Sequence, residues 1–457
     1  MNILQLKKQH ELNLGSVDDI VVDLSSEMFV ASHLSKSPTG NIRLLESILE
    51  WNNMQKALKR VISNKGAPGI DGMKVGQLSK YLERHWPKIE KALLDGSYTP
   101  LPVRRKEIKK SEGGTRLLGI PAVLDRMIQQ MIAQVLTLIW DHTFSDHSYG
   151  FRPKRSQADA IYKAQSYIVE DNFVAIDMDL SKFFDRVNHD RLMSRLATKV
   201  ADKRVLKLIR AFLESGVMID GVVTETEEGA PQGGPLSPLL SNIVLDELDK
   251  ELEKRKLHFV RYADDFVIYV KSKEAGERVM KSVTRYVTSK LRLKVNEEKS
   301  AVGRPWNRKF LGFRFTKNKK NPQICLHEKS LKRFKDKIRE LTSRNCGKSL
   351  QRVVNELMLY MKGWWGYYNI IESKTQLSRI ENWIRRRLRM LLWKQWKNRS
   401  TRVRELLKRG IARKYALTTG CARKGYWRMS NVKWVVIALP NETFHSLGLE
   451  FPWISRA

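Results

Sequence analysis

The sequence predicts an α/β (α+β) core, followed by a helical bundle and a small basic C-terminal domain. Strand-like and helix-like segments alternate from the glycine-rich stretch GAPGIDG (66–72) to about residue 315. After that point, apolar residues recur at the three- and four-residue spacing that is typical of amphipathic helices. Three helices of one bundle are predicted, with apolar positions Leu331, Phe334, Ile338 and Leu341; Leu350, Val353, Leu357, Met361 and Trp364; and Leu377, Ile380, Ile384, Leu388 and Leu391.

The predicted segments follow one another in a simple order. Residues 1–40 form a weakly patterned extension, and a helical pattern covers 42–63 within the α/β region of residues 41–315. The helical bundle occupies 316–397, and a basic tail with glycines and aromatic residues occupies 398–457. Inside the α/β region, Ser237 and Pro238 are typical of a helix start and predict a helix over 238–252.

The charge of the chain narrows the class of partner. Its 457 residues carry 84 Lys and Arg against 49 Asp and Glu, a formal net charge of +35, with 42% hydrophobic content. Such a balance in a globular chain favours a polyanionic partner, most simply nucleic acid, although a solvated basic surface or an anionic membrane would also fit. No apolar run is long enough for a membrane span, the start lacks a signal peptide, and three scattered cysteines form no zinc set. We therefore expect a cytoplasmic protein with no membrane partner.

Two acidic strands stand out in this basic chain. In HFVRYADDFVIYV (258–270), strand-like runs flank Ala263, Asp264 and Asp265, which predicts a hairpin with these residues at its tip. In FVAIDMDL (173–180), Asp177 and Asp179 share one strand face. Carboxylates from two strands, together with phosphate oxygens, provide the oxygen ligands that Mg²⁺ prefers, and a pair of such ions suits phosphoryl transfer. The alternative is that these are ordinary loop and strand-edge acids.

A series of motifs in a fixed order resembles the group II intron-encoded reverse transcriptases, or maturases. YADDFVIYV resembles the metal-binding hairpin of reverse transcriptases, and AIDMDLSKFFDRVNHDRL (175–192) resembles their other carboxylate motif. The match continues through GAPGIDGM (66–73), GGTRLLGIP (113–121), SYGFRPKRSQADAI (148–161), GAPQGGPLSPLLSN (229–242), LKVNEEKS (293–300), FLGFRF (310–315), GWWGYYN (363–369) and GYWRMSNVKWVVIALPNETFHSLGL (425–449). The resemblance implies a right-hand polymerase fingers–palm with a helical thumb and a small C-terminal nucleic-acid-binding domain.

The resemblance also implies roles for single residues in the acidic motifs. Asp179 and Asp264 would be the ligands of two Mg²⁺ ions, with Asp265 supporting them and Asp177 secondary. Phe184 would lie under the ribose of the incoming nucleotide, where a 2′-hydroxyl would collide with its ring. The pattern alone favours the alternative, that Phe184 is a core aromatic residue beside Phe183.

Three further residues are implied to bind the nucleotide. Lys109 and Arg116 flank a glycine turn, and such a basic pair can hold a triphosphate, although a solvated basic hairpin is the alternative. Gln232 matches the family's nucleotide-contacting glutamine. Gly233 and Gly234 beside it allow a backbone to approach a substrate closely.

The helical end is strongly basic. From Arg379 to Arg413 there are 13 Lys or Arg and two acids, interleaved with Trp383, Trp393 and Trp396. Basic residues among aromatic ones suit a groove for a nucleic-acid backbone, although tryptophans at positions such as 383 and 393 are more often core residues than stacking partners. In the family this region is the thumb, which also binds the intron RNA, and nucleic-acid contacts are predicted for Arg385, Arg386, Arg387 and Arg389.

The sequence thus predicts an RNA-directed DNA polymerase encoded by a bacterial group II intron, which copies intron RNA into DNA and assists splicing and mobility. The expected partners are the intron RNA, an RNA template/DNA primer duplex, target DNA and deoxynucleoside triphosphates. The tail holds only Cys421 and His445, too few ligands for the metal-bound endonuclease module of many relatives, so the endonuclease-lacking class is expected. Two alternatives stay open: a splicing cofactor without polymerase activity, and a domesticated reverse transcriptase in DNA repair or phage defence.

Overall fold

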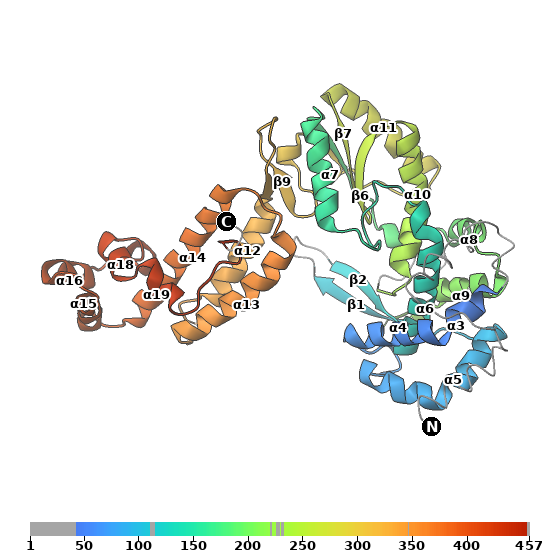
Figure 1. The fold of residues 1–457 in the computed structure, drawn as a ribbon, viewed down its shortest axis with the longest axis horizontal. Coiled ribbons are helices and arrows are strands. Elements are labelled where there is room, and N and C mark those ends of the chain that lie inside the picture. The colour runs from blue at the N-terminus through green and yellow to red at the C-terminus, as the bar shows by residue number, and fades with distance from the viewer. Residues whose placement is uncertain are drawn as a thin grey trace. The chain divides into compact units, whose positions relative to one another are not determined.

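The computed structural model describes residues 43–109, 115–219, 222–224, 229, 233–345 and 347–454, so the predicted extension over 1–40 lies outside the described residues. The described chain forms two compact units (Figure 1). The first contains the described residues up to Ala164 together with Val174–Val302, and the second contains Gln165–Phe173 and the described residues from Gly303 onward. No helix among the described residues is long and apolar enough to cross a membrane.

The central sheet of the first unit joins the two acidic segments. Its strand order is β6-β7-β3-β8, built from β6 (His258–Tyr262), β7 (Asp265–Val270), β3 (Val174–Met178) and β8 (Ala301–Gly303). The predicted hairpin is confirmed, because β6 and β7 pair antiparallel, but its tip is shorter than predicted, since Asp265 belongs to β7 and pairs with Tyr262. Strand β3 pairs antiparallel with β7 and ends with Met178 opposite Phe266.

Helices cover this sheet. Helix α10 (Ser237–Lys254) packs on β6, and α11 (Lys273–Ser289) packs on β3 and β7. Figure 1 shows both helices next to the sheet. The predicted helix over 238–252 is thus present and begins one residue earlier. Helix α7 (Gln157–Val169) begins in the first unit and ends in the second.

The N-terminal part of the first unit is mainly helical. It contains α3 (Leu44–Leu49), α4 (Trp51–Ser63), α5 (Leu78–Leu94) and the long α6 (Val123–Trp140). The helical pattern predicted over 42–63 is confirmed from Leu44 to Ser63, but it forms two helices, because Glu50 adopts an extended conformation (φ −49°, ψ 138°) that separates α3 from α4. A second sheet, in the order β2-β1-β4-β5, contains β1 (Val103–Lys109), β2 (Thr115–Ile120), β4 (Val217–Ile219) and β5 (Val222–Thr224).

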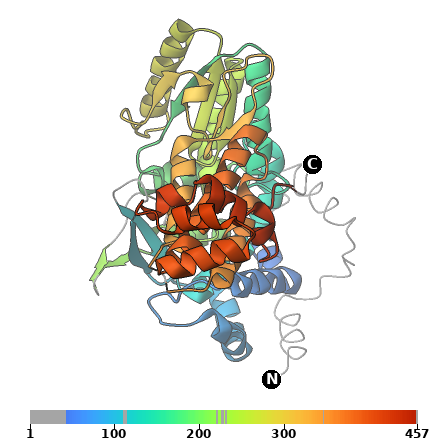
Figure 2. The same cartoon turned by 90° about the vertical axis from the view of Figure 1, so that its left-hand side faces the viewer.

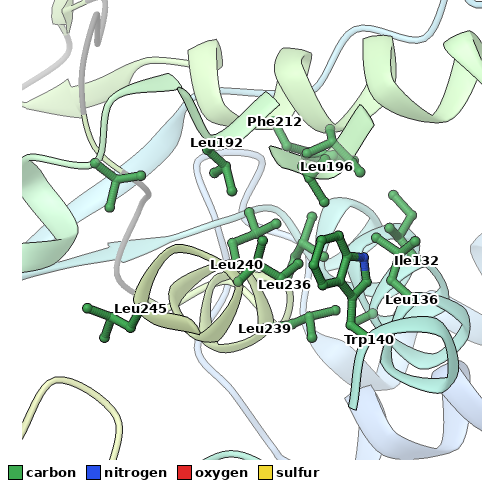
Figure 3. Packing of buried hydrophobic residues seen from close by; sticks show 14 of the residues in the cluster. Ile132, Leu136, Trp140, Leu192, Leu196, Phe212, Leu236, Leu239, Leu240 and Leu245 are labelled. Carbon is green, nitrogen blue, oxygen red and sulfur yellow. The ribbon is translucent and has the colours of Figure 1, made fainter. Parts of the chain in front are cut away.

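One apolar cluster fixes these helices to one another. Figure 3 shows Trp140 of α6 packed near leucines of α10 and of α8 (His189–Ala197), with Phe212 of α9 (Lys203–Glu214) beside them. Trp140 and Leu240 are buried. Burial of apolar surface stabilises the fold by about 25 cal/mol for each Å². These contacts therefore fix the position of α10, which packs on β6.

The second unit contains the predicted helical bundle. A two-stranded sheet of β9 (Phe313–Phe315) and β10 (Ile324–Leu326) precedes α12 (Glu328–Leu341), α13 (Leu350–Tyr368) and α14 (Lys374–Gln395). The three predicted amphipathic helices are confirmed, since Ile338, Leu357 and Leu388 are all fully buried.

The tail belongs to the same compact unit. It contains α15 (Arg399–Lys408), α16 (Arg413–Gly420), α17 (Tyr426–Met429), α18 (Lys433–Ala438) and α19 (Asn441–His445). Helices α15, α16 and α18 pack together, as Figure 2 shows, and α17 packs on α14. The predicted domain boundaries at residues 315 and 397 stay predictions.

Candidate metal centre

A tight hairpin presents Asp264 and Asp265. Two residues, Ala263 and Asp264, connect β6 to β7, and Ala263 has a φ of +59°. A positive φ at the first position of a two-residue turn suits the strand twist but is usually adopted by glycine. Ala263 is buried, Asp264 is half-buried and Asp265 is exposed. Ala263, directly before Asp264, therefore has a backbone conformation that its surroundings must enforce.

Asp179 lies at the same edge of the sheet. It follows Met178, which pairs with Phe266 at the β7 end nearest the hairpin tip. Its backbone N–H donates to the Ser300 hydroxyl at 3.0 Å, and its carbonyl accepts from the Asn296 N–H at 2.8 Å. Adjacent strands thus bring Asp179 and the hairpin aspartates to one edge.

The carboxylate of Asp179 is held and neutralised by its own chain. Its Oδ2 accepts a hydrogen bond from Asn296 Nδ2 at 3.0 Å and lies 3.4 Å from the Lys299 ammonium. Asp177, two residues back, is half-buried opposite Val267. Lys299 is 62% exposed, so this cation sits on a flexible stem beside a carboxylate that can accept a positive ion.

The carboxylates at this edge of the sheet fit Mg²⁺ only if water and substrate oxygens supply the remaining ligands. In the part of the chain that the structure describes, no three acidic, histidine or cysteine side chains converge to enclose a metal ion. Mg²⁺ commonly binds through one or two carboxylates and completes its octahedron with water and phosphate oxygens. Asp179 and Asp264 match that pattern.

Phe184 lies in a short 3-10 helix (Phe183–Asp185) that follows Lys182 in the left-handed region. Its side chain is 8% exposed, and its ring meets Phe183 edge-on at 5.2 Å between centroids. A buried ring serves as a core residue and can still form the floor of a nucleotide site, so both interpretations of Phe184 stay open.

Gly229, the first residue of the GAPQGG motif, lies against the segment that contains Phe184. Gly229 has a φ of +98°, and a Cβ there would lie 2.9 Å from the Phe184 carbonyl oxygen. The Gly229 N–H donates to the Val187 carbonyl at 2.9 Å, and buried His189 Nε2 donates to the Gly229 carbonyl at 2.6 Å. Sequence reasoning did not find His189, since its only signal is a histidine at a helix start.

The structure describes only part of the predicted nucleotide-binding residues. Lys109 and Arg116 lie on the paired strands β1 and β2, but their side chains and all of Gln232 lie outside the described residues. Gly233 approaches the chain itself: a Cβ would lie 2.3 Å from the Gly119 carbonyl oxygen. Nucleotide binding by Lys109, Arg116 and Gln232 stays a prediction.

A buried arginine that sequence reasoning missed lies beneath the hairpin tip. Arg261 of β6 is fully buried and forms an ion pair with Asp249 of α10, which is also fully buried. Burial raises the pKa of the Asp249 carboxyl, and the contact with Arg261 opposes that rise. The residue before a YADD tip gives no sequence signal of burial, because lone strand arginines usually face solvent.

The four predicted nucleic-acid contacts of α14 are engaged within the second unit. Arg385 pairs with Glu381 at 3.2 Å, and the Arg386 guanidinium lies 3.9 Å from the Trp427 ring centroid. Arg387 donates to the Thr342 hydroxyl, and buried Arg389 donates to the Leu439 carbonyl at 2.9 Å.

Burial lowers the pKa of Arg387 and of Arg389 from its ordinary value. These contacts favour structural roles, particularly for Arg389, and nucleic-acid binding by the four stays a prediction. Trp393 and Trp396 are buried core residues, whereas half-buried Trp383 has three cations near its ring.

Two family models match the chain. The model described as "Reverse transcriptase (RNA-dependent DNA polymerase)" matches residues 108–315, and the model described as "Group II intron, maturase-specific domain" matches residues 331–410. The first match contains both acidic strands, and the second contains most of the helical bundle.

Curated relatives agree with these models. Protein YkfC of Escherichia coli K12 is 33% identical over 300 residues, which are 57% of this chain and 79% of that protein. The group II intron-encoded protein LtrA of Lactococcus lactis is 30% identical over 345 residues, covering 60% of this chain and 57% of LtrA. The putative COX1/OXI3 intron 2 protein of Saccharomyces cerevisiae is 31% identical over 229 residues, covering 48% of this chain and 26% of that protein. The match thus spans less than two thirds of the two intron proteins.

Solved structures are more distant. A telomerase from Candida albicans has a TM-score of 0.41 at 14% identity, over 67% of this chain and 63% of that one. A partial Cas6-RT-Cas1–Cas2 complex has a TM-score of 0.35 at 23% identity, over 60% of this chain and 46% of that one.

Proposed function

Because the chain belongs to the group II intron-encoded reverse transcriptases and maturases, we propose that it is an RNA-directed DNA polymerase that copies intron RNA into DNA and assists splicing and mobility of the intron. The observation that carries this proposal is the meeting of Asp179 and Asp264 at one sheet edge through adjacent strands. A binding module has no need of such a pair of acids in a strongly basic chain.

We propose that Asp179 and Asp264, supported by Asp265, hold Mg²⁺. A pair of these ions would neutralise the triphosphate and align the primer hydroxyl for in-line attack. The chain's own contribution is positioning: Asn296 fixes the orientation of the Asp179 carboxylate through its side-chain amide. Lys299 balances that negative charge and is exposed enough to move away.

Phe184 is proposed to select the sugar of the nucleotide. Gly229 packs against the Phe184 backbone, and His189 donates a hydrogen bond to the Gly229 carbonyl. These contacts limit how far the Phe184 ring can move. In a site of fixed depth, a ring beneath the ribose would reject a 2′-hydroxyl by contact. Lys109, Arg116 and Gln232 are proposed to bind the triphosphate and base.

The proposed nucleic-acid partners are intron RNA, a template–primer duplex and target DNA. The net charge of +35 supports them, since each phosphate contact releases counterions and strengthens binding at low salt. The match to a maturase-specific domain over 331–410 supports the RNA partner in particular. Deoxynucleoside triphosphates are the proposed small substrates.

Asp179→Asn and Asp264→Asn test the proposed centre. An amide keeps the shape of the side chain and loses its charge, so each change is expected to lower primer extension roughly 100-fold or more while sparing RNA binding. The matched control is Asp171→Asn, because Asp171 is exposed in the turn before β3 and its positive φ suits asparagine.

Extension with Mg²⁺ and filter binding to intron RNA are measured on the same preparations. Substantial synthesis by either site variant would refute the metal assignment. A parent protein that promotes splicing but makes no DNA would instead identify a splicing cofactor.

A further inference from the structure

Arg261 has no free hydrogen-bond donor. Its Nε and Nη2 donate to the Asp249 carboxylate at 2.8 and 2.6 Å. Nη2 also donates to the Ser148 hydroxyl at 2.7 Å, and Nη1 donates to Asn242 Oδ1 at 2.9 Å and to the Ala263 carbonyl at 3.0 Å. These contacts use all five N–H groups of a guanidinium.

The acceptors come from three different segments of the first unit. Asn242 and Asp249 are two helical turns apart on one face of α10, which the apolar cluster anchors. Ser148 belongs to the loop before α7, and its neighbours pair with Arg261 through the backbone: Arg261 N–H donates to the His147 carbonyl and Tyr149 N–H to the Arg261 carbonyl, both at 2.9 Å. Arg261 thus joins the helix, the loop and the hairpin.

The contact with Ala263 is the one that reaches the candidate metal centre. The Ala263 carbonyl is part of the peptide group that links Ala263 to Asp264. Fixing that oxygen fixes the peptide plane, and rotation of that plane would turn the Asp264 side chain. Ala263 itself has a positive φ, which costs a non-glycine residue of order 1 kcal/mol and persists only where neighbours enforce it.

Gly150 also contacts the turn. Gly150 lies against it so tightly that a Cβ would be 2.3 Å from the Ala263 nitrogen. Asn242 Nδ2 donates to the Gly150 carbonyl at 2.9 Å, so the residue that accepts from Arg261 also holds Gly150. Both the Arg261 guanidinium and the Gly150 backbone therefore contact Ala263.

Stability alone does not explain a buried ion pair here. Desolvating two charges is costly, and apolar residues of similar volume often replace such pairs with no loss of stability. An apolar residue at position 261 could fill the space but could not bind the Ala263 carbonyl. We propose that Arg261, paired with Asp249, is a positioning residue that holds Asp264 in its metal-binding orientation, a proposal that rests on the proposed function.

A double variant, Arg261→Met with Asp249→Leu, separates positioning from folding. It removes both charges together, so no unpaired charge is left buried. The expected result is a folded protein that needs roughly 10- to 100-fold more Mg²⁺ for half-maximal primer extension, the usual loss when the support of a metal ligand is removed. Hydrogen exchange of the 263–265 amides, measured without metal, is expected to quicken about tenfold as the turn opens locally.

Two further variants complete the design. Arg261→Lys keeps a cation for Asp249 but offers too few donors to reach Ala263 as well, so it should fold and still show the raised Mg²⁺ requirement. Arg204→Met is the matched control, because Arg204 pairs with buried Asp202 at 2.9 Å in the same unit but does not contact the hairpin. It should lower the thermal midpoint and leave the Mg²⁺ requirement and the exchange of 263–265 unchanged.

The proposal would be overturned if folded Arg261→Lys, or the double variant, needed no more Mg²⁺ than the parent protein and exchanged its 263–265 amide hydrogens at the parental rate. An equal effect in Arg204→Met would also overturn it, since general destabilisation would then be the cause. If the parent made no DNA at all, the proposed function would fail, and exchange in the metal-free protein would still decide whether Arg261 holds the turn.

Discussion

Replacing Gly150 by alanine is expected to displace the aspartate hairpin. The backbone of Gly150 lies against the turn, and an added Cβ would be 2.3 Å from the Ala263 nitrogen and 3.0 Å from the Tyr262 carbonyl carbon. Both contacts are with backbone atoms, so no flexible side chain can move aside. The turn and the Gly150 backbone must therefore move apart.

The size of the shift follows from the same distances. Ordinary contact with a Cβ begins at 3.4 Å, so the separation between the added Cβ and the Ala263 nitrogen must grow by about 1.1 Å. A displacement of this size at a reacting centre costs roughly 100-fold in rate. Overpacking of a close-packed site also costs about 1–3 kcal/mol of stability, which a protein of this size can survive.

The assay is single-nucleotide incorporation at saturating template–primer, measured over a range of Mg²⁺ concentrations. Gly76→Ala is the matched control, because Gly76 lies in the same unit with nothing within 4 Å of an added Cβ. We expect a large loss of kcat for Gly150→Ala and none for Gly76→Ala. A folded Gly150→Ala protein with the parental kcat and Mg²⁺ requirement would refute the idea that the turn must be held within about 1 Å.

Three other changes have defined outcomes. Phe184→Ala should raise ribonucleotide use relative to deoxyribonucleotide use by at least about tenfold in single-nucleotide incorporation; unchanged discrimination would leave Phe184 a core aromatic residue. Burial raises the pKa of Asp125 from 3.8 to about 6, so the folded state binds an extra proton between these values and loses roughly 2 kcal/mol of stability as the pH rises from 4 to 7. Asp125→Asn cannot ionise, so its stability relative to the parent in urea titrations should rise by up to that amount over the same range; a constant difference would contradict this. Arg389→Leu should lower stability by roughly 1–3 kcal/mol, because the buried Leu439 carbonyl loses its donor. Lost RNA affinity at parental stability would instead support the direct contact predicted for Arg389.

Local patterns in the sequence were sufficient for the elements that carry the aspartates. Aromatic and β-branched runs on either side of Ala263, Asp264 and Asp265 predicted the hairpin, and the structure closes it at Tyr262 and Asp265. The spacing of leucines and isoleucines predicted α12, α13 and α14. The strand pattern and the helix pattern were both readable because each depends only on neighbours within a few residues. The helical pattern over 42–63 did not show that one extended residue, Glu50, divides it into two helices, because no glycine or proline marks that position.

The sequence by itself therefore determined the family, the acidic strands and the helical end. Only the tertiary structure decided which charges face inward. Arg261 meets partners 12, 19 and 113 residues away, and Arg389 meets a carbonyl 50 residues away. A buried arginine is tolerated only where several acceptors converge on it, and that convergence depends on how distant segments pack, which no local pattern of residues records.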